Sequence, residues 1–264
     1  MIFRRFGLLV ALMLVAGCSG LGQTPPPPPF SPESLATALK LTENAPPAGY
    51  EQVAFPKVDQ HLEDMSAFHY MLEVRFDGVI DANLQPVSGV LRAEVWWDGI
   101  APARRVVLRA EGGAFAGEID QLEAVRLIED YYLVNEDGRC LINIDDTARA
   151  AANLAASALI GGVRSAPYSG TQAILNGIQA YRYDVLTEQV DLPLITTGGD
   201  SVVHVVGELW VAPAYDVVTR YYANFDVSRV RLLDSEQSVS GQLYIRYDLT
   251  DLDEIPNISI PFGC

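Results

Sequence analysis

Residues 66–76, SAFHYMLEVRF, decide the fold that we expect for this chain. Large apolar side chains alternate here with more polar ones, with the apolar set at Phe68, Tyr70, Leu72, Val74 and Phe76. Successive side chains of a β-strand point to opposite faces of a sheet. The stretch therefore predicts a long strand with one buried face and one solvated face.

The same two-residue period returns along most of the chain, at residues 87–97, 106–110, 181–185, 203–211, 217–225 and 239–249. Shorter apolar runs at 122–128, 131–134 and 140–144 add further strands, and a tight hairpin is expected at Asn135–Gly138. Short connections between neighbouring strands favour antiparallel pairing. We therefore expect a meander of roughly nine to eleven strands.

One segment breaks this pattern. Residues 145–160, DDTARAAANLAASALI, are rich in Ala and Leu and end at Gly161 and Gly162, which predicts a helix with an aspartate cap. Shorter helices are expected at residues 31–41 and 58–65, and one further turn at 171–176.

Together these elements predict an α+β fold, in which a few helices pack on the concave face of a large, strongly curved antiparallel sheet that forms a half-open barrel. Because the helices are few and the strands long, we expect an apolar cavity to remain between the two layers. Such a cavity has the usual character of a ligand pocket.

The N-terminus predicts the compartment. Arg4 and Arg5 precede an apolar run that ends in the small residues before Cys18. This order is that of a signal peptide, and the run of roughly 11 residues is short of the about 20 that a spanning helix needs. A cysteine directly after the small residues makes a lipobox, so we expect a diacylglyceryl thioether on Cys18 and an acyl group, such as palmitate, on its amine.

Three segments follow from this interpretation. Residues 1–17 are the signal peptide, residues 18–30 are the lipidated cysteine and a proline-rich tether, and residues 31–264 are a single domain. The proline run favours an extended spacer between membrane and domain. The protein is expected outside the cytoplasm, in the cell envelope or periplasm, and Ser19 leaves open which membrane carries the anchor.

Charge limits the partners. The formal net charge is −16, and no basic surface for a nucleic acid is visible in the sequence. The acidity also argues against a domain that lies flat on anionic lipid, and solubility is its simplest explanation. An envelope protein partner is left open.

Cys140 and Cys264 remain when Cys18 is lipidated. In an oxidising compartment a disulfide between them is expected, with two separate thiols as the alternative. No Cys/His spacing predicts a metal site, and we expect no cofactor.

Sequence motifs of catalysis are scarce, and we expect that this protein is not an enzyme. The sequence has no nucleophile elbow, phosphate loop or zinc-protease motif. His69 and His204 are expected at the surface, and the carboxylates from Asp248 to Glu254 in a solvated loop. Glu94 and Glu208 would form a glycosidase pair only if about 5 to 10 Å separated them, which the sequence does not determine.

A family resemblance adds to this interpretation. The opening SAFHYMLEVRF is followed by YYLV…GRC, GIQAYRYDV, GELWVAPAYDVVTRYYA and LYIRYDLTDLDEIPNISIP. In this order, behind a lipobox, the segments resemble the LppX/LprG-type lipoproteins of the LolA/LolB-like carrier superfamily. The resemblance implies a half-open barrel closed by helices, with acyl chains of lipids or lipoproteins held inside.

We therefore expect a membrane-anchored lipoprotein that binds and carries a lipid or other hydrophobic ligand. The alternative is an envelope scaffold or partner-binding lipoprotein without a cavity. The inward-facing apolar residues would hold the ligand, or else form an ordinary dry core: Tyr70, Leu72, Val74, Phe76, Leu91, Val95 and Trp97 from the sheet, with Leu154 and Leu159 from the helix.

Overall fold

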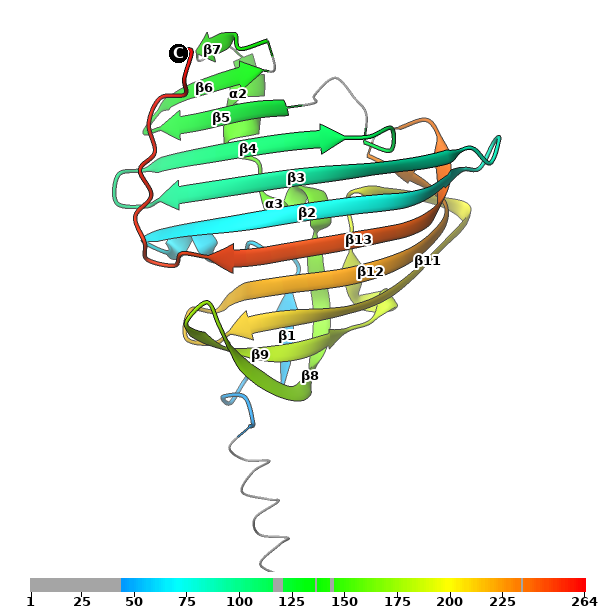
Figure 1. The fold of residues 1–264 in the computed structure, drawn as a ribbon. Helices are drawn as coiled ribbons and strands as arrows, with labels where there is room; N and C mark the ends of the chain where they lie inside the picture. The colour runs from blue at the N-terminus through cyan, green and yellow to red at the C-terminus, as the bar shows by residue number, and fades with distance from the viewer. Residues whose placement is uncertain (1–43, 116–120, 136, 143–144, 234) are drawn as a thin grey trace, which may run out of the picture. The chain divides into compact units, whose positions relative to one another are not determined.

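One antiparallel sheet of 13 strands dominates the described part of the chain (Figure 1). The computed structural model describes residues 44–115, 121–135, 137–142, 145–233 and 235–264. These residues belong to one unit of the chain, Lys40–Cys264. The expected helix at residues 31–41, the signal peptide, Cys18 and the proline-rich tether lie outside them.

The strands follow the chain in a mostly meandering order. Their bounds are β1 Gln52–Phe55, β2 Ala67–Ile80, β3 Pro86–Asp98, β4 Ala103–Glu111, β5 Gln121–Leu127, β6 Asp130–Asn135, β7 Cys140–Ile142, β8 Gly162–Leu175, β9 Ile178–Val185, β10 Val190–Asp191, β11 Ile195–Ala212, β12 Val217–Leu232 and β13 Ser238–Thr250. Across the sheet the order is β1-β8-β9-β11-β12-β13-β2-β3-β4-β5-β6-β7, and β10 pairs with β8.

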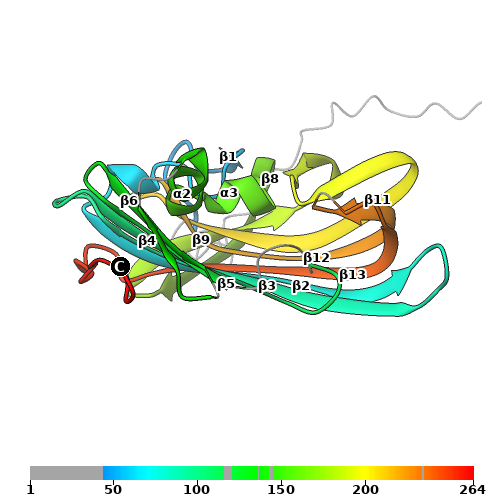
Figure 2. The ribbon, with the colours of Figure 1, turned by 90° about the horizontal axis from the view of Figure 1, so that it is seen from above.

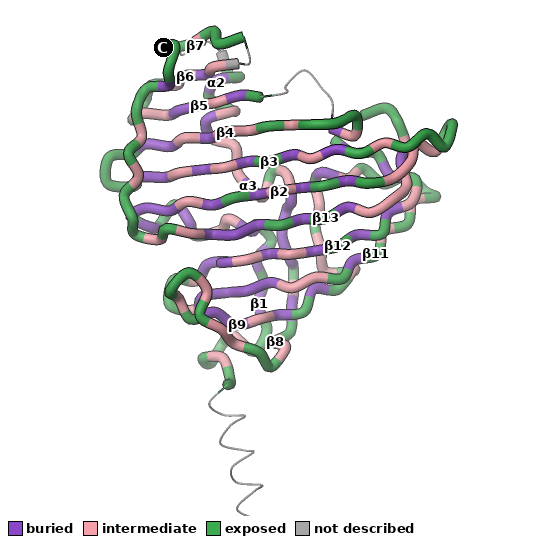
Figure 3. The backbone as a smooth tube through the Cα atoms, in the orientation of Figure 1, coloured by how far each residue is buried: buried purple, intermediate pink, exposed green. Residues whose placement is uncertain are grey.

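The alternation along β2 places it at the centre of this sheet. β2 pairs with β3 on one side and β13 on the other, with Leu72 opposite both Ala93 and Tyr247. Buried and exposed residues alternate along these strands (Figure 3). The large apolar side chains of the three strands therefore share one face.

That face is concave and carries a covering layer (Figure 2). The layer contains the helices α2 Asp145–Ala152 and α3 Ala156–Ile160, the short 3-10 helix η1 Leu62–Asp64, β1, and the first part of β8, to which β1 and β10 pair. A second 3-10 helix, η2 Thr187–Gln189, follows β9. The structure confirms the predicted fold class of a large curved antiparallel sheet with few helices.

The predicted helix at residues 145–160 is broken in two between Ala152 and Ala156. Two arginines of the sheet explain the break: Arg126 donates to Asn153 Oδ1 at 2.6 Å and Arg104 to the Leu154 carbonyl at 2.8 Å. Ala155 is extended, with φ −92° and ψ 144°. The helical pattern predicted the segment but not the contacts that interrupt it.

The predicted helical turn at residues 171–176 is wrong. These residues complete β8, which turns at Asn176 and Gly177 into β9. Both turn residues have positive φ, 50° and 81°, and Asn-Gly is a strong signal for a two-residue hairpin turn. Of the helix predicted at 58–65, only η1 forms.

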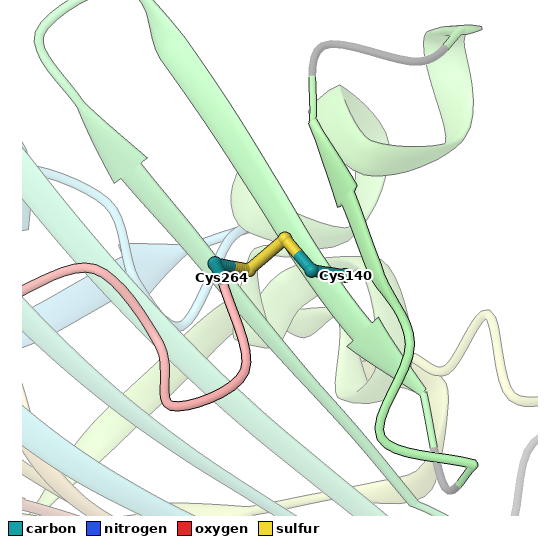
Figure 4. The surroundings of a disulfide bond; sticks show 2 residues. All are labelled: Cys140 and Cys264. Atoms are coloured by element: carbon teal, nitrogen blue, oxygen red, sulfur yellow. A yellow bond between two sulfur atoms is a disulfide. The ribbon is translucent and has the colours of Figure 1, made fainter.

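Residues 251–264, which follow β13, form a segment that we call the strap. After β13 the chain crosses the ends of several strands and reaches β7 (Figure 1), and it is held on the way by the bond from Asp253 N to the Ala67 carbonyl. There Cys264 forms a disulfide with Cys140, 124 residues away in sequence (Figure 4). The disulfide thus joins the C-terminus to the edge strand of the sheet.

Replacing both cysteines by serine is expected to lower the free energy of unfolding by about 4 kcal/mol, because a closed loop longer than about 100 residues restricts the unfolded chain strongly. Urea unfolding of the wild type and of the Cys140→Ser/Cys264→Ser variant measures the difference. Reducing agent should destabilise the wild type alone, and equal sensitivity of both proteins would contradict the prediction.

Candidate functional site

The candidate ligand residues of the sheet form one wall on the concave face. Each of the seven is exposed by 7% or less of its surface: Tyr70, Leu72, Val74 and Phe76 on β2, and Leu91, Val95 and Trp97 on β3. Leu154 and Leu159 are half-buried and pack against the same core. The structure therefore brings all nine predicted residues into one cluster.

Where an open cavity was expected, the chain's own residues cover the seven wall residues in this structure, because each is exposed by 7% or less. Besides the helices, β1, the turn that follows it, η1 and the start of β8 also bury apolar residues on this face: Val53, Phe55, Val58, Leu62 and Val163. These segments come from before and after the sheet's central strands, so no local pattern announces that they cover it.

The helical segment, residues 145–160, contributes mostly small side chains to this cover. Its buried apolar residues are three alanines and one larger side chain: Ala148, Ala152, Ala156 and Ile160. Burial of a methyl or methylene group contributes about 0.8 kcal/mol, against about 1.5 to 3 kcal/mol for a whole Leu, Ile or Phe side chain. Half-buried Leu154 and Leu159 add to these contacts. The fully buried apolar contacts of α2, which packs on β4, β5 and β6, come from alanines alone and hold it only weakly.

Polar contacts hold the helical segment instead, and Arg104 is their centre. Its side chain is 5% exposed and lies on the concave face opposite Trp97. It donates to the Leu154 carbonyl at 2.8 Å, to Tyr70 Oη at 3.5 Å and to Glu63 Oε1 at 3.2 Å. The backbone N–H of Ser157 donates to Asp59 Oδ2 at 3.2 Å.

Cation–aromatic contacts continue the same interface. The Arg126 guanidinium lies 5.0 Å from the Trp97 ring centroid, and Arg149 of α2 lies 5.4 Å from the Tyr131 ring. Such contacts contribute about 0.5 to 2 kcal/mol, depending on how far the cation is desolvated. Arg126 of β5 and Trp97 of β3 both belong to the sheet, so of these two contacts the one between Arg149 and Tyr131 joins the cover to the sheet, at β6.

A pocket of about 330 Å³ opens where η1 and α3 approach the sheet. Tyr70 and Phe68 lie at its apolar side, while Asp59, Glu63 and Arg104 contribute charges. It brings solvent next to the wall residue Tyr70, beside the Arg104 contacts. This polar pocket was not predicted from the sequence.

Four fully buried tyrosines lie on the concave face: Tyr70, Tyr183, Tyr221 and Tyr247. Tyr183 Oη donates to the Tyr50 carbonyl at 2.7 Å, and Tyr70 Oη accepts from Arg104. The hydroxyls of Tyr221 and Tyr247 find no hydrogen-bond partner among the described residues. Burial raises the pKa of both phenols well above the ordinary value, so both stay protonated at neutral pH.

On the outer face, Asp248 corrects an expectation. It was predicted in a solvated acidic loop, but it is buried on β13 and accepts hydrogen bonds from Arg220, Arg246 and Tyr222. Although burial works in the opposite direction, these hydrogen bonds lower the pKa of Asp248 below its usual range. The cluster is an ion-pair network on the sheet.

His69 lies on the outer face as predicted, but it is half-buried rather than freely exposed. Its ring nitrogens contact Glu94 and Asp251 at 3.0 Å each, and it stacks on Trp96 with 4.7 Å between ring centroids. The strap passes beside this stack, where a pocket of about 270 Å³ forms. The group fixes the strap to the sheet.

Glu94 and Glu208 are too far apart to act together as a glycosidase pair. They lie on β3 and β11, between which the sheet order places β2, β13 and β12. Neighbouring strands are about 4.8 Å apart, which gives about 19 Å between these two strands. Glycosidase carboxyl pairs lie about 5 to 10 Å apart.

Among the described residues, no cluster of three or more His, Cys, Asp or Glu side chains is arranged to hold a metal ion. None of their helices combines the length and the apolar character that crossing a membrane requires.

No protein-family model and no curated protein matches the chain. Three solved structures are similar to it at low scores. An uncharacterised conserved protein from Thermus thermophilus aligns with TM-score 0.25 and 12% identity over 85% of this chain and 97% of that one. A LolA superfamily protein from Nitrosomonas europaea aligns with TM-score 0.25 and 8% identity, over 78% and 96%.

The third is a DUF1329 family protein from Desulfovibrio piger, with TM-score 0.20 and 9% identity over 76% of this chain and 90% of that one. We draw no conclusion about function from TM-scores this low. The site is therefore interpreted from its own residues.

Replacing Arg104 by Met is expected to lower the free energy of unfolding by about 2 to 3 kcal/mol, because the Leu154 carbonyl and Tyr70 hydroxyl lose a buried donor. Urea unfolding measures the loss. Hydrogen exchange should show the first loss of protection at residues 145–160.

The matched control is Arg92→Met on the outer face, where the arginine is 48% exposed and pairs with Glu73. It should cost no more than about 1 kcal/mol. Equal losses in the two variants would show that Arg104 does not hold the cover.

Proposed function

We propose that this protein is an extracytoplasmic lipoprotein, anchored through Cys18, that binds and carries a lipid or other hydrophobic ligand on the concave face of its sheet. One observation carries the proposal: the concave face bears a wall of large apolar and aromatic side chains, and the fully buried residues of the helical segment on that face are mainly alanines. In this segment α2 packs on β4, β5 and β6, and α3 lies behind β2 and β3 (Figure 1). In this scheme the chain is a carrier of the LppX/LprG type.

The energetics of the cover support a movable helical segment. A ligand with acyl chains would bury more apolar area against Tyr70, Leu72 and Trp97 than the alanines do, at about 25 cal/mol per Å². Displacement of α2 and α3 costs polar contacts at Arg104 and Asn153, and water replaces those contacts once the segment moves out. The free energy lost when the helical segment moves out is therefore close to the free energy gained when the ligand binds.

The polar pocket between η1 and α3 suits an entrance. It lies beside Tyr70 and Arg104, where the helical segment is held by hydrogen bonds. A ligand entering there would meet the apolar wall directly behind the charged rim. Binding of this kind needs no catalytic group, and we propose no enzymatic activity.

A second candidate function rests on the filled core. Because the wall residues are buried in this structure, the sheet is also suited to a scaffold or partner-binding lipoprotein that never opens. In that case a partner would bind the outer face, which has a groove of about 360 Å³ lined by Met71, Arg92 and Glu94. The two candidates differ in whether the core takes up a ligand.

Lipid bound to the purified chain separates these candidates. We expect native mass spectrometry of the full chain, with the detergent removed, to show co-purified lipid or uptake of added dioleoylglycerol at about one molecule per chain. Uptake should weaken hydrogen-exchange protection at residues 145–160 and leave residues 66–76 protected. An empty chain that takes up no lipid would favour the scaffold.

The anchor is tested by Cys18→Ser. Expressed in a bacterial host, the wild type should sediment with membranes and carry an N-terminal mass increase for the diacylglyceryl and acyl groups, because two or more chains anchor stably. The serine variant should lack both properties. A wild type without the added mass would contradict lipidation.

A further inference from the structure

Two buried hydroxyls on the concave face are without a partner. Tyr221 of β12 and Tyr247 of β13 are both 0% exposed. Neither Oη atom makes a hydrogen bond to any residue that the structure describes. A buried polar group left unpaired costs about 1 to 3 kcal/mol, and native proteins tolerate few of them.

The two residues are direct neighbours. Tyr221 and Tyr247 are opposite each other in the register of β12 and β13. Cβ atoms of such cross-strand pairs are about 5 Å apart, and both side chains stand on the same face. The two unpaired donors therefore lie side by side on the concave face, next to the wall residue Leu72, which is opposite Tyr247.

Packing alone does not require these hydroxyls. Phe68, Phe76 and Phe225 occupy buried positions on β2 and β12, so the wall accepts phenylalanine elsewhere. The other two fully buried tyrosines use their hydroxyls, because Tyr183 donates to the Tyr50 carbonyl and Tyr70 accepts from Arg104. Of the four fully buried tyrosines, Tyr221 and Tyr247 are therefore the two whose hydroxyls have no hydrogen-bond partner among the described residues.

We propose that Tyr221 and Tyr247 are the polar end of the ligand site, and that the ligand is an acyl ester whose carbonyl oxygens accept hydrogen bonds from these two hydroxyls. The inference rests on the proposed carrier function and specifies its ligand. Tyr247 packs against Tyr70, with 5.3 Å between the ring centroids, and α3 lies behind β2 and β3 (Figure 1). When α3 moves away from Tyr70, the acyl chains lie along the apolar wall and the ester reaches the tyrosine pair.

The surroundings favour a neutral ester over a carboxylate. Arg220 and Arg246 pair with Asp248 on the outer face, and Arg104 donates to the Tyr70 hydroxyl beside Tyr247. The Arg104 guanidinium is also occupied by Glu63 and the Leu154 carbonyl. A ligand carboxylate here would therefore be buried without a free cation among these described arginines, which is costly, whereas a carbonyl accepts both hydroxyls without that cost.

The experiment compares two lipids that differ only in the carbonyl groups: dioleoylglycerol, a diester, and dioleylglycerol, the corresponding diether. Affinities of the full chain are measured by displacement of a fluorescent acyl probe. We expect the wild type to bind the diester about 10-fold more tightly, the effect of one or two hydrogen bonds. The double variant Tyr221→Phe/Tyr247→Phe should bind both lipids with the affinity that the wild type has for the diether.

Stability of the lipid-free chain gives an independent readout. The double phenylalanine variant should unfold at the same or higher urea concentration than the wild type, because it removes two unpaired buried hydroxyls. The matched control Tyr183→Phe removes a paired hydroxyl and should unfold at lower urea concentration. A less stable double variant would show that the two hydroxyls already have partners, such as a buried water, and would overturn the proposal.

The outcomes separate this inference from the carrier function. If the wild type binds diester and diether equally, the chain is a carrier but the tyrosine pair does not select esters. Selectivity that survives in the double variant places the ester elsewhere. If neither lipid binds the wild type, the carrier function itself fails. Oleate bound more tightly than the diester would replace the ester by a carboxylate and overturn the ligand class.

Discussion

The structure depends on the alternation of large apolar and polar side chains along β2 and its neighbours. Because the side-chain period of a strand is two, a slip of one residue in the pairing of β2 with β13 would turn Tyr70, Leu72 and Phe76 toward solvent. The observed register instead aligns β2 with Tyr247 and Ile245 across the sheet. The concave wall, its cover and the candidate site all follow from that register.

The segments of the covering layer differ in the size of the side chains that they bury on the concave face. β1, η1 and the start of β8 fill their parts of the wall with large side chains, and those parts are a conventional core. The segment from Asp145 to Ile160 contributes three alanines and Ile160 to the buried core, with Leu154 and Leu159 half-buried, and it accepts hydrogen bonds from arginines of β4 and β5. Local stability in proteins follows the density of apolar contacts, so this segment is the part of the cover suited to movement.

Much of the fold could be predicted from the sequence because it follows from the short-range periodicity of apolar residues. The long strands, the face to which their apolar residues point and the Ala-rich helical segment all appear as short-range patterns. Asn176-Gly177 was also a readable signal, but the helical composition of the residues before it concealed the hairpin. The break at Asn153–Ala155 was not readable, because it is imposed by Arg104 and Arg126 from distant strands.

The sequence by itself determined the alternation that makes one face of the sheet apolar, and with it a curved antiparallel sheet that needs a cover. It also named the residues of the wall, because their period is local. Only the tertiary structure decided that the wall is filled, that Asp248 is buried between arginines, and that Tyr221 and Tyr247 stand side by side without partners among the described residues. These facts depend on pairing between segments far apart in the chain, which no local pattern encodes.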